Sequence, residues 1–299
     1  MRFVAVDCGQ TKSEVTVFEK RGKIRTWFEK PVLHPAAEGG MECLGYIVTN
    51  VLTELVLDGV QNINICFSLS GFHGEHEIVQ YIRNIVDKIL PEVSNVWIIP
   101  DYLGNWFSVT GGNPGMVIIS GGGTIAYGEN GKGEKRRLGG WGHLLGDEGS
   151  GYWFGLQTIK AVLRSINGLT PPTMLVESVK ERLGTSDEFE IAHLLYSGRI
   201  SDADIALITP SMIQSAEKGD VIAKEILKKG VAHLVELAEN MTRQLGTIPI
   251  HASGGVFRSP FIQIEFNKQM ETKGLIRPSI KAVKPEEGIL RYMKTNIVD

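Results

Sequence analysis

The sequence has few cysteines, and none of them forms a pair with metal or redox spacing. Its 299 residues contain three, Cys8, Cys43 and Cys66, which lie far apart in the chain. An odd number of scattered cysteines without a CxxC pair argues against a disulfide framework and against a zinc ribbon. The pattern is typical of reduced thiols in a cytosolic protein, so we expect a cytoplasmic location.

Other absences exclude further classes of protein. The chain has 31 Lys and Arg against 34 Asp and Glu, a net charge of −3, and no basic block stands out, so no nucleic-acid partner is expected. No uninterrupted apolar run reaches the roughly 18 residues of a membrane span, and the opening MRFVAVD lacks a signal-peptide pattern, so no membrane partner is expected. Neither GxxxxGKS nor GxxxxGKT occurs, which excludes a P-loop nucleotide site.

Glycine, by contrast, is abundant and concentrated in one stretch. Residues 139–155 read GGWGHLLGDEGSGYWFG, with seven glycines among seventeen residues. Glycine permits positive φ and close approach of the backbone to another group. Asp147 lies in this stretch, and Ser150 precedes an apolar run with helical spacing as a plausible N-cap. The composition suits a polar ligand rich in hydroxyls or phosphates at a helix N-terminus; the alternative is a tight hairpin and a helix cap without a ligand.

Two segments of the chain share one pattern, which indicates an internal repeat. In each, a short apolar strand is followed by a polar residue, a glycine turn and two further short strands, so each predicts a three-stranded antiparallel meander. Chance similarity of short patterns is the alternative. Because 299 residues also exceed the usual size of a single core, we expect two similar α/β domains that face each other across a cleft. The matching positions are 3–6 with Asp7, Gly9 and Thr11, and 116–119 with Ser120, Gly122 and Thr124.

Glycine and proline also mark the expected domain boundary. The run GGNPG at 111–115 is the strongest linker candidate. We expect an N-terminal lobe of residues 1–112 and a C-terminal lobe of residues 113–285. The second half is predicted to be mostly helical, with one helix over 204–217 and a long one over 221–244.

Three glycine turns that follow apolar strands, at 7–11, 120–124 and 253–255, could bind phosphate. Backbone N–H groups and threonine hydroxyls of such turns can hold phosphate oxygens, although each turn alone is a weak signal. Residues 121–126 also meet a loose GxGxxA pattern, but a strand rather than a helix is predicted to follow, so dinucleotide binding is not expected. Three turns in one chain, two of them related by a repeat, favour a nucleotide held between two hairpins.

Asp7 and Asp101 each end an apolar strand. Phosphoryl transfer to an alcohol needs a carboxylate that accepts the hydroxyl proton and a group that holds Mg²⁺ near the phosphates. One aspartate for each task would suffice, although either could simply cap a turn. His73 and His76 form an HxxH pair without a third suitably spaced ligand, so a loop and helix start is the favoured interpretation. Cys8 is interpreted as a small residue that fills a tight turn.

These segments match a known family. The chain resembles the N-acetylglucosamine kinase branch of the sugar kinase/Hsp70/actin superfamily, which is grouped with the BadF/BadG/BcrA/BcrD ATPases. The matching segments occur in family order over nearly the whole chain, and GGWGHLLGDEGSGYW is the most specific of them. They are residues 6–13, 68–71, 101, 119–124, 139–153 and 253–256.

The resemblance implies two similar ribonuclease H-like α/β domains, of the actin and hexokinase type, around a central nucleotide and sugar cleft. It implies that the last helix, within 286–299, completes the first lobe. Asp101 would be the base that accepts the proton of the sugar 6-hydroxyl, and Asp7 would orient Mg²⁺ through water. ATP would contact Gly9, Thr11, Lys12, Gly121, Gly122, Gly123, Thr124, Gly254 and Gly255, and the sugar would contact Ser70, Gly71, Gly142 and Asp147.

The implied activity is transfer of the γ-phosphate of ATP to the 6-hydroxyl of N-acetylglucosamine or a related amino sugar or hexose. Dimers are common among relatives, so a homodimer is the assembly that the resemblance suggests. Some departures put the sugar's identity in question: residues 31–35 read PVLHP, with His34, where the family's N-acetylglucosamine kinases usually have an asparagine, and Ile125 and Ala126 replace a more polar pair. Cys8 and Gln10 stand where the family usually has glycines.

Two other classes of protein remain as alternatives at this point. The first is an ATPase that activates a partner enzyme, of the 2-hydroxyacyl-CoA dehydratase or benzoyl-CoA reductase activator type. Those proteins hold an iron–sulfur cluster between subunits, whereas no cysteine here lies in a paired cluster motif. The second is a non-catalytic sugar sensor. Such a protein would need a DNA-binding or effector segment, and we expect no residues of this chain to be left over for one.

Overall fold

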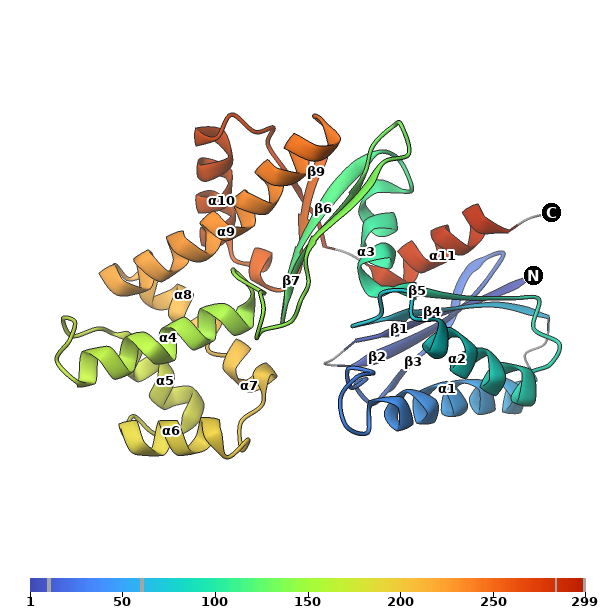
Figure 1. Ribbon diagram of the computed structural model, residues 1–299, viewed down its shortest axis with the longest axis horizontal. Coiled ribbons are helices and arrows are strands. Elements are labelled where there is room, and N and C mark those ends of the chain that lie inside the picture. Colours follow the sequence, from blue (N-terminus) through green and yellow to red (C-terminus); the bar gives the residue numbers. More distant parts are fainter. Residues whose placement is uncertain (10–11, 60–61, 283, 298–299) are drawn as a thin grey trace. The chain divides into compact units, whose positions relative to one another are not determined.

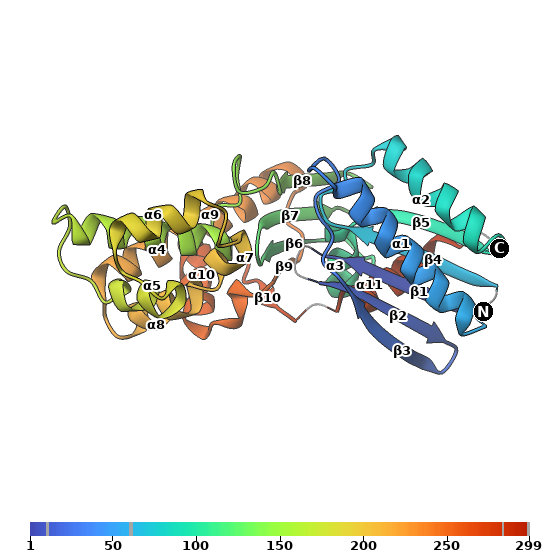
Figure 2. The same ribbon diagram turned by 90° about the horizontal axis from the view of Figure 1, so that it is seen from below.

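The computed structural model describes residues 1–9, 12–59, 62–282 and 284–297. The chain divides into two compact units, the first formed by Met1–Asn113 with Val283–Asp299 and the second by Pro114–Ala282. Each unit contains a five-stranded mixed sheet (Figure 1 and Figure 2). Gln10 and Thr11, the latter predicted to contact ATP, lie outside the described residues.

The sheet of the first unit has the strand order β3-β2-β1-β4-β5. Its first three strands form an antiparallel meander, and β4 and β5 extend it parallel to β1. The register places Asp7 beside Ser68, and Ser68 beside Ile99, so the carboxyl ends of β1, β4 and β5 meet at one edge. The strands are β1 (Arg2–Cys8), β2 (Ser13–Glu19), β3 (Gly22–Glu29), β4 (Ile63–Leu69) and β5 (Asn95–Pro100).

Helices cover both faces of this sheet because its strands alternate between two apolar cores. Val4 and Val6 of β1 pack in one core with α1 (Gly40–Leu57) and α2 (His76–Ile89). Phe3 and Ala5 pack in the other with the C-terminal helix, next to α3 (Figure 1). These two helices are α3 (Asp101–Thr110) and α11 (Pro285–Asn296).

One helix of the described chain, α1, is long and apolar enough to cross a membrane by length and composition alone, with a mean hydropathy of 1.3. Several of its apolar side chains, among them Leu44, Ile47, Val51 and Leu55, are fully buried in the core of the first unit, whereas Leu57 at its C-terminal end is exposed. The apolar character of α1 is therefore accounted for by packing against the sheet.

Helices α3 and α11 approach each other at two glycines. A Cβ on Gly288 would overlap the carbonyl oxygen of Gly104 and lie 2.7 Å from the backbone nitrogen of Ser108. Ser108 Oγ accepts a hydrogen bond from the Lys284 N–H at 3.0 Å, and the Ser108 carbonyl accepts one from Arg291 Nη1 at 3.1 Å. Backbone contact therefore holds the C-terminal helix in the first unit.

We expect Gly288→Ala to destabilise the first unit by about 1–3 kcal/mol, because the added methyl has no space and the helices must separate. Thr295→Ala on the same helix is the control. It removes only a bond to the Arg291 carbonyl within the helix, and we expect a change of less than about 0.5 kcal/mol. Urea unfolding of both variants checks this, and equal midpoints would show that the glycine contact contributes nothing.

The second unit has the strand order β10-β9-β6-β7-β8. Again three antiparallel strands, β6 to β8, are extended by parallel strands, β9 and β10, so the two sheets share one connectivity. This confirms the internal repeat and the α/β class that the sequence predicts. The strands are β6 (Gly115–Ser120), β7 (Thr124–Glu129), β8 (Lys135–Gly139), β9 (Ile250–Ser253) and β10 (Ser279–Ile280).

The rest of the second unit is helical. The long helix α9 packs against β6, β7 and β8, and most other helices join it in one apolar core. The helices are α4 (Gly151–Ile166), α5 (Leu175–Leu183), α6 (Glu188–Tyr196), α7 (Asp202–Ala206), α8 (Thr209–Glu217), α9 (Val221–Leu245), the 3₁₀ turn η1 (Val256–Arg258) and α10 (Pro260–Thr272).

The single helix predicted over 204–217 is wrong, since two helices, α7 and α8, occupy this segment. Pro210 lies in the first turn of α8. Proline has no N–H to donate to the carbonyl of Ala206, and its ring would clash with that carbonyl in a continuous helix. A proline is well tolerated at a helix start, so the chain ends one helix and begins another.

Candidate active site

In the first unit, two carboxylates lie at the carboxyl edge of the sheet. Asp7 is on β1, and its Oδ1 accepts a hydrogen bond from Ser68 Oγ of β4 at 3.2 Å. Asp101 follows β5 directly and is the first residue of α3. Burial, followed by the charge of Asp101, raises the pKa of Asp7 to about 7, against the smaller lowering effect of the Ser68 hydrogen bond. The two carboxylates are therefore close enough to repel each other.

Two further acidic residues add to this negative field. Glu14 of β2 and the buried Glu286 of α11 each raise the pKa of Asp7 slightly. Each has a cationic partner: Lys12 Nζ lies 2.9 Å from Glu14, and Lys23 Nζ lies 3.2 Å from Glu286. Lys12, predicted to contact ATP, is thus engaged by Glu14 in the first unit.

The turn after β1 is tight at Gly9. The Gly9 N–H donates to the Lys12 carbonyl at 3.1 Å, and a Cβ on Gly9 would lie 2.9 Å from that oxygen. Only glycine fits this turn without a shift. Cys8, next to it, is fully buried, and burial raises the pKa of its thiol, so the side chain fills space as predicted rather than acting as a nucleophile.

Ser70 and Gly71, predicted to contact the sugar, form the turn after β4. The Ser70 N–H donates to the Cys8 carbonyl at 3.0 Å, which joins this turn to the end of β1. Gly71 has φ of +75°, and a Cβ there would lie 2.6 Å from Cδ2 of His34. His34 Nδ1 accepts from the Ala36 N–H at 3.1 Å. The loop with PVLHP therefore lies directly against the predicted sugar turn.

The HxxH pair lies in the loop before α2 and at the start of that helix. His73 donates its backbone N–H to Glu75 Oε2 at 2.8 Å, and His76 begins the helix. Within the described residues, no group of three or more His, Cys, Asp or Glu side chains could hold a metal ion by itself. The interpretation of this pair as a loop and helix start is confirmed.

In the second unit, Gly121 to Thr124 form an open turn between β6 and β7. The Gly121 N–H donates to the Gly123 carbonyl at 2.9 Å, whereas the N–H groups of Gly122 and Gly123 have no acceptor in the described part of the chain. A Cβ on Gly121 or Gly122 would meet no atom within 4 Å. The Thr124 hydroxyl is buried and has no partner among the described residues.

The glycine-rich stretch 139–155 is bonded to this turn. Gly140 N–H donates to the Thr124 carbonyl, and Gly151 N–H to the Gly121 carbonyl, both at 2.8 Å. Ser120 Oγ donates to the Gly149 carbonyl at 2.7 Å. Ser150 Oγ accepts from the Trp153 N–H at 3.0 Å, which confirms it as the N-cap of α4. The two segments form one structural element.

Asp147 lies beneath the turn. Its Oδ1 accepts a hydrogen bond from the Thr124 N–H at 2.9 Å, and only 9% of the residue is exposed. Burial raises the pKa of Asp147, against the lowering effect of the Thr124 hydrogen bond. Gly142, predicted with Asp147 to contact the sugar, lies in the exposed part of the same loop with φ of +80°.

The third glycine turn follows β9. Gly254 has φ of +106°, and a Cβ there would overlap the carbonyl oxygen of Ser120, so glycine is required for the approach of the two strand ends. A Cβ on Gly255 would meet no atom within 4 Å. The hydroxyl of Ser253 is buried without a partner in the described chain. Both glycine turns of the second unit therefore lie at one edge of its sheet.

Residues of the first unit suit Mg²⁺, and residues of the second unit suit the phosphates of ATP. Mg²⁺ prefers hard oxygen ligands, and the buried Asp7 carboxylate lies among like charges that a nearby cation would offset. For ATP, the N–H groups of Gly122 and Gly123 and the Thr124 hydroxyl have no partner among the described residues, and together they form a cradle of donors that suits phosphate. A buried hydroxyl without a partner costs about 1–3 kcal/mol, so an added ligand atom would be stabilising.

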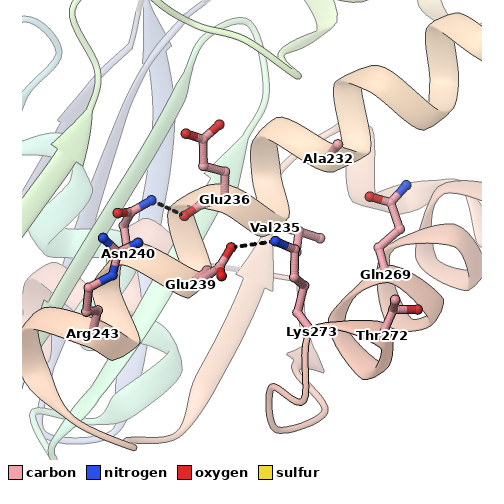
Figure 3. A pocket seen from close by; sticks show the side chains of 9 residues that line it. All are labelled: Ala232, Val235, Glu236, Glu239, Asn240, Arg243, Gln269, Thr272 and Lys273. Atoms are coloured by element: carbon pink, nitrogen blue, oxygen red, sulfur yellow. Dashed lines mark hydrogen bonds and ion pairs between the residues drawn. The ribbon is translucent and has the colours of Figure 1, made fainter.

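Two of the cavities found among the described residues lie in the second unit. The larger, about 410 Å³, lies between α9 and α10 and is crossed by the Lys273–Glu239 ion pair at 3.0 Å (Figure 3). None of the predicted site residues line it. The smaller, about 110 Å³, is lined by Thr124, Gly139 and Asp147 together with residues of α9. Two of the predicted site residues, Thr124 and Asp147, therefore line the smaller cavity.

The structure thus gathers the predicted residues into two sets. Asp7, Gly9, Ser70, Gly71 and Asp101 share the sheet edge of the first unit. The turns at 121–124 and 254–255 share the corresponding edge of the second, with Asp147 beneath the first of them. Sequence reasoning assigned no role to Ser68, Ser120 or Ser253. The sequence feature that could have identified these serines is their position at strand ends, beside the predicted aspartate and glycines.

The fold places the chain in a known structural class. A solved structure from Chromobacterium violaceum, provisionally described as an N-acetylglucosamine kinase, superposes with a TM-score of 0.78 at 19% identity, over 98% of each chain. The chain therefore has the α/β fold of the actin-like sugar kinases, with two similar domains. The predicted fold class is confirmed.

The sequence profile of the BadF/BadG/BcrA/BcrD ATPase family matches residues 4–287, and the chain belongs to this family. It is 27% identical over 252 residues to an N-acetylmuramic acid/N-acetylglucosamine kinase of Clostridium acetobutylicum, which covers 79% of this chain and 80% of the relative. It is 28% identical over 256 residues to an N-acetyl-D-glucosamine kinase of Dictyostelium discoideum, with 82% and 80% covered. The predicted family is confirmed.

Proposed function

We propose that this protein is an ATP-dependent sugar kinase that transfers the γ-phosphate of ATP to the 6-hydroxyl of an N-acetylated amino sugar. The observation that carries the proposal is the carboxylate pair Asp7 and Asp101 at the end of parallel strands, where Asp7 has a pKa raised to about 7. Phosphoryl transfer to an alcohol needs two such groups, one for the hydroxyl proton and one for the cation. The family, described as ATPases, supports the use of ATP, and the names of both curated relatives support an amino-sugar kinase.

The proposal assigns a task to each set of residues. Asp101 accepts the proton of the sugar hydroxyl, and Ser68 holds the Asp7 carboxylate in place from the neighbouring strand. Asp7 would hold Mg²⁺ through water, and the ion would supply positive charge that offsets the phosphates. The N–H groups of the turn at Gly122 and Gly123 bind phosphate oxygens, and the turn at Gly254 and Gly255 contacts the adenosine.

The sugar is proposed to contact Ser70, Gly71, Gly142 and Asp147. Both curated relatives are named for N-acetylglucosamine, and one is also named for N-acetylmuramic acid, so these two sugars are the first candidates. His34 lies against Gly71 and replaces the asparagine usual in this loop, which supports testing a wider range of sugars. We also propose a cytoplasmic location and a homodimeric assembly.

The direct test is sugar-dependent ADP release with Mg·ATP. The panel contains N-acetylglucosamine, N-acetylmuramic acid, glucosamine, glucose and mannose. We expect turnover with at least one N-acetylated sugar and little ADP release without sugar, because sugar kinases limit idle hydrolysis by closing on the sugar and excluding water. A high sugar-independent rate, or no turnover with any sugar while ATP still binds, would contradict the proposal.

The partner-activating ATPase is less well supported by the structure. It needs cysteine thiolates that can reach a cluster shared between subunits. All three cysteines, Cys8, Cys43 and Cys66, are buried, and burial raises the pKa of the Cys8 and Cys66 thiols. A brown, iron-containing purified protein would nevertheless favour that function over a sugar kinase.

A further inference from the structure

We propose that Asp147 is a positioning residue for the phosphate-binding turn, and that it sets nucleotide affinity before any sugar binds. The inference rests on the proposed function, since it takes the turn of Gly121 to Thr124 as the site of the ATP phosphates. It goes beyond the sugar contact that the resemblance implies for Asp147. The residue acts through the Thr124 backbone rather than on the ligand itself.

The contact between Asp147 and the turn is direct and buried. Oδ1 accepts from the Thr124 N–H at 2.9 Å. The rest of the carboxylate lies along Gly123, because a Cβ on that glycine would be 2.9 Å from Oδ2 and 3.1 Å from Oδ1. A hydrogen bond from a backbone N–H to a carboxylate is stronger than one between neutral groups. Only glycine at position 123 leaves space for the carboxylate.

The backbone of Asp147 is held in an uncommon conformation. Its φ is +63°, one of two positive values among the described non-glycine residues. This left-handed conformation is disfavoured for most residues with a side chain, and among them Asp and Asn adopt it most readily. The Asp147 carbonyl accepts from the Ser150 N–H at 3.0 Å, at the cap of α4. The helix start and the turn thus hold the residue from two sides, which keeps the carboxylate beneath Thr124.

This arrangement determines which donors of the turn remain available. Thr124 gives its N–H to Asp147, and Gly121 gives its own to the Gly123 carbonyl. The N–H groups of Gly122 and Gly123 have no acceptor in the ranges that the structure describes. Without the carboxylate, the Thr124 N–H would lack its acceptor and the turn could relax. The geometry of the two remaining donors would then no longer be fixed.

The test measures ADP affinity by calorimetry without sugar. For Asp147→Ala we expect a Kd that rises about 10- to 100-fold, the effect of losing a hydrogen bond to a charged group. Asp147→Asn keeps an oxygen that can accept from Thr124, so we expect a rise of less than about fivefold. Rescue by the conservative variant distinguishes positioning from a general loss of structure.

Asp187→Ala is the matched control. Asp187 also accepts one backbone N–H at 2.9 Å, from Glu190 at the N-terminus of α6 in the same unit, but it lies outside the candidate site. Its loss should lower stability by about 1 kcal/mol, the effect of removing a helix cap, and leave the Kd for ADP unchanged. Urea unfolding of both alanine variants separates a stability effect from a binding effect.

The possible outcomes separate this inference from the proposed function. If Asp147→Ala binds ADP as tightly as wild type while its KM for sugar rises, Asp147 is a sugar ligand only and the inference is overturned. If both alanine variants lose ADP affinity in proportion to their loss of stability, the inference is likewise overturned. If wild type binds no nucleotide at all, it is the proposed function that fails.

Discussion

Asp101→Asn is expected to lower kcat for the sugar substrate by about 10²–10⁴-fold, the usual contribution of general acid–base catalysis. The asparagine side chain has nearly the same shape and can still accept a hydrogen bond from a sugar hydroxyl, but it cannot take up the proton. We therefore expect the KM for sugar to change far less than kcat. A large fall in kcat with little change in KM would assign Asp101 to the chemical step rather than to binding.

The measurement is steady-state ADP release at saturating Mg·ATP over a range of sugar concentrations. Asp87→Asn is the matched control, because Asp87 is an exposed aspartate on α2 of the same unit and lies outside the candidate site. We expect it to retain wild-type turnover. If Asp101→Asn kept kcat within about threefold of wild type, its carboxylate would not be the base, and Asp7 would be the next residue to test.

Asp7→Asn is expected to abolish turnover and yet stabilise the protein without ligands. The pKa of Asp7 is raised from 3.8 to about 7 in the folded state, so ionisation of this carboxyl above pH 7 opposes folding. The uncharged asparagine removes that cost and can still accept the hydrogen bond from Ser68. The gain in free energy of unfolding should be roughly 2–4 kcal/mol at about pH 8, since one pKa unit corresponds to about 1.4 kcal/mol.

The difference in stability between wild type and Asp7→Asn should depend on pH in one direction. Below the unfolded pKa, near 4, both states carry a protonated Asp7, so wild type and variant should be equally stable with respect to this group. As pH rises from about 4 to about 7, the unfolded wild type loses its proton first and wild-type stability falls relative to the variant. Above about pH 7 the difference is constant. Urea unfolding at several pH values measures it, and a variant less stable than wild type at about pH 8 would contradict the raised pKa.

The combination of lost activity and gained stability has a physical reason. A carboxylate that binds a cation must be ionised, even though the folded protein without ligands does not neutralise its charge. Burial and the charge of Asp101 oppose ionisation of Asp7 in the absence of ligands. A bound cation would reverse this balance and favour the carboxylate form. Asp7→Asn therefore tests whether the carboxylate is kept for ligand binding at a cost in stability.

Much of the architecture could be predicted from the sequence. Apolar runs ended by glycine or aspartate predicted the strands of both sheets, and the matching pattern at 3–11 and 116–124 predicted that the sheets share one connectivity. Ser150 was recognised as a helix cap from its position before an apolar run. These features depend on side-chain periodicity and local backbone hydrogen bonds, which neighbouring residues determine. The break between α7 and α8 was missed because the apolar spacing continues across Pro210.

From the sequence, the candidate site could be predicted only as a set of aspartates and glycines at the ends of strands. Asp7 and Asp101 were recognised because each follows an apolar run, and their shared sheet edge follows from parallel pairing with β4. The sequence by itself thus determined the family and the repeated fold, and it predicted the residue types of the candidate site.

The tertiary structure alone decided what surrounds those residues. The bond from Ser68 to Asp7, the approach of Glu286 from the C-terminal helix and the carboxylate of Asp147 beneath Thr124 all join residues far apart in the chain. Sequence spacing carries no information about such contacts, because they depend on strand register and helix packing. Burial and repulsion between charges, which set the pKa of Asp7, arise only when distant segments are brought together.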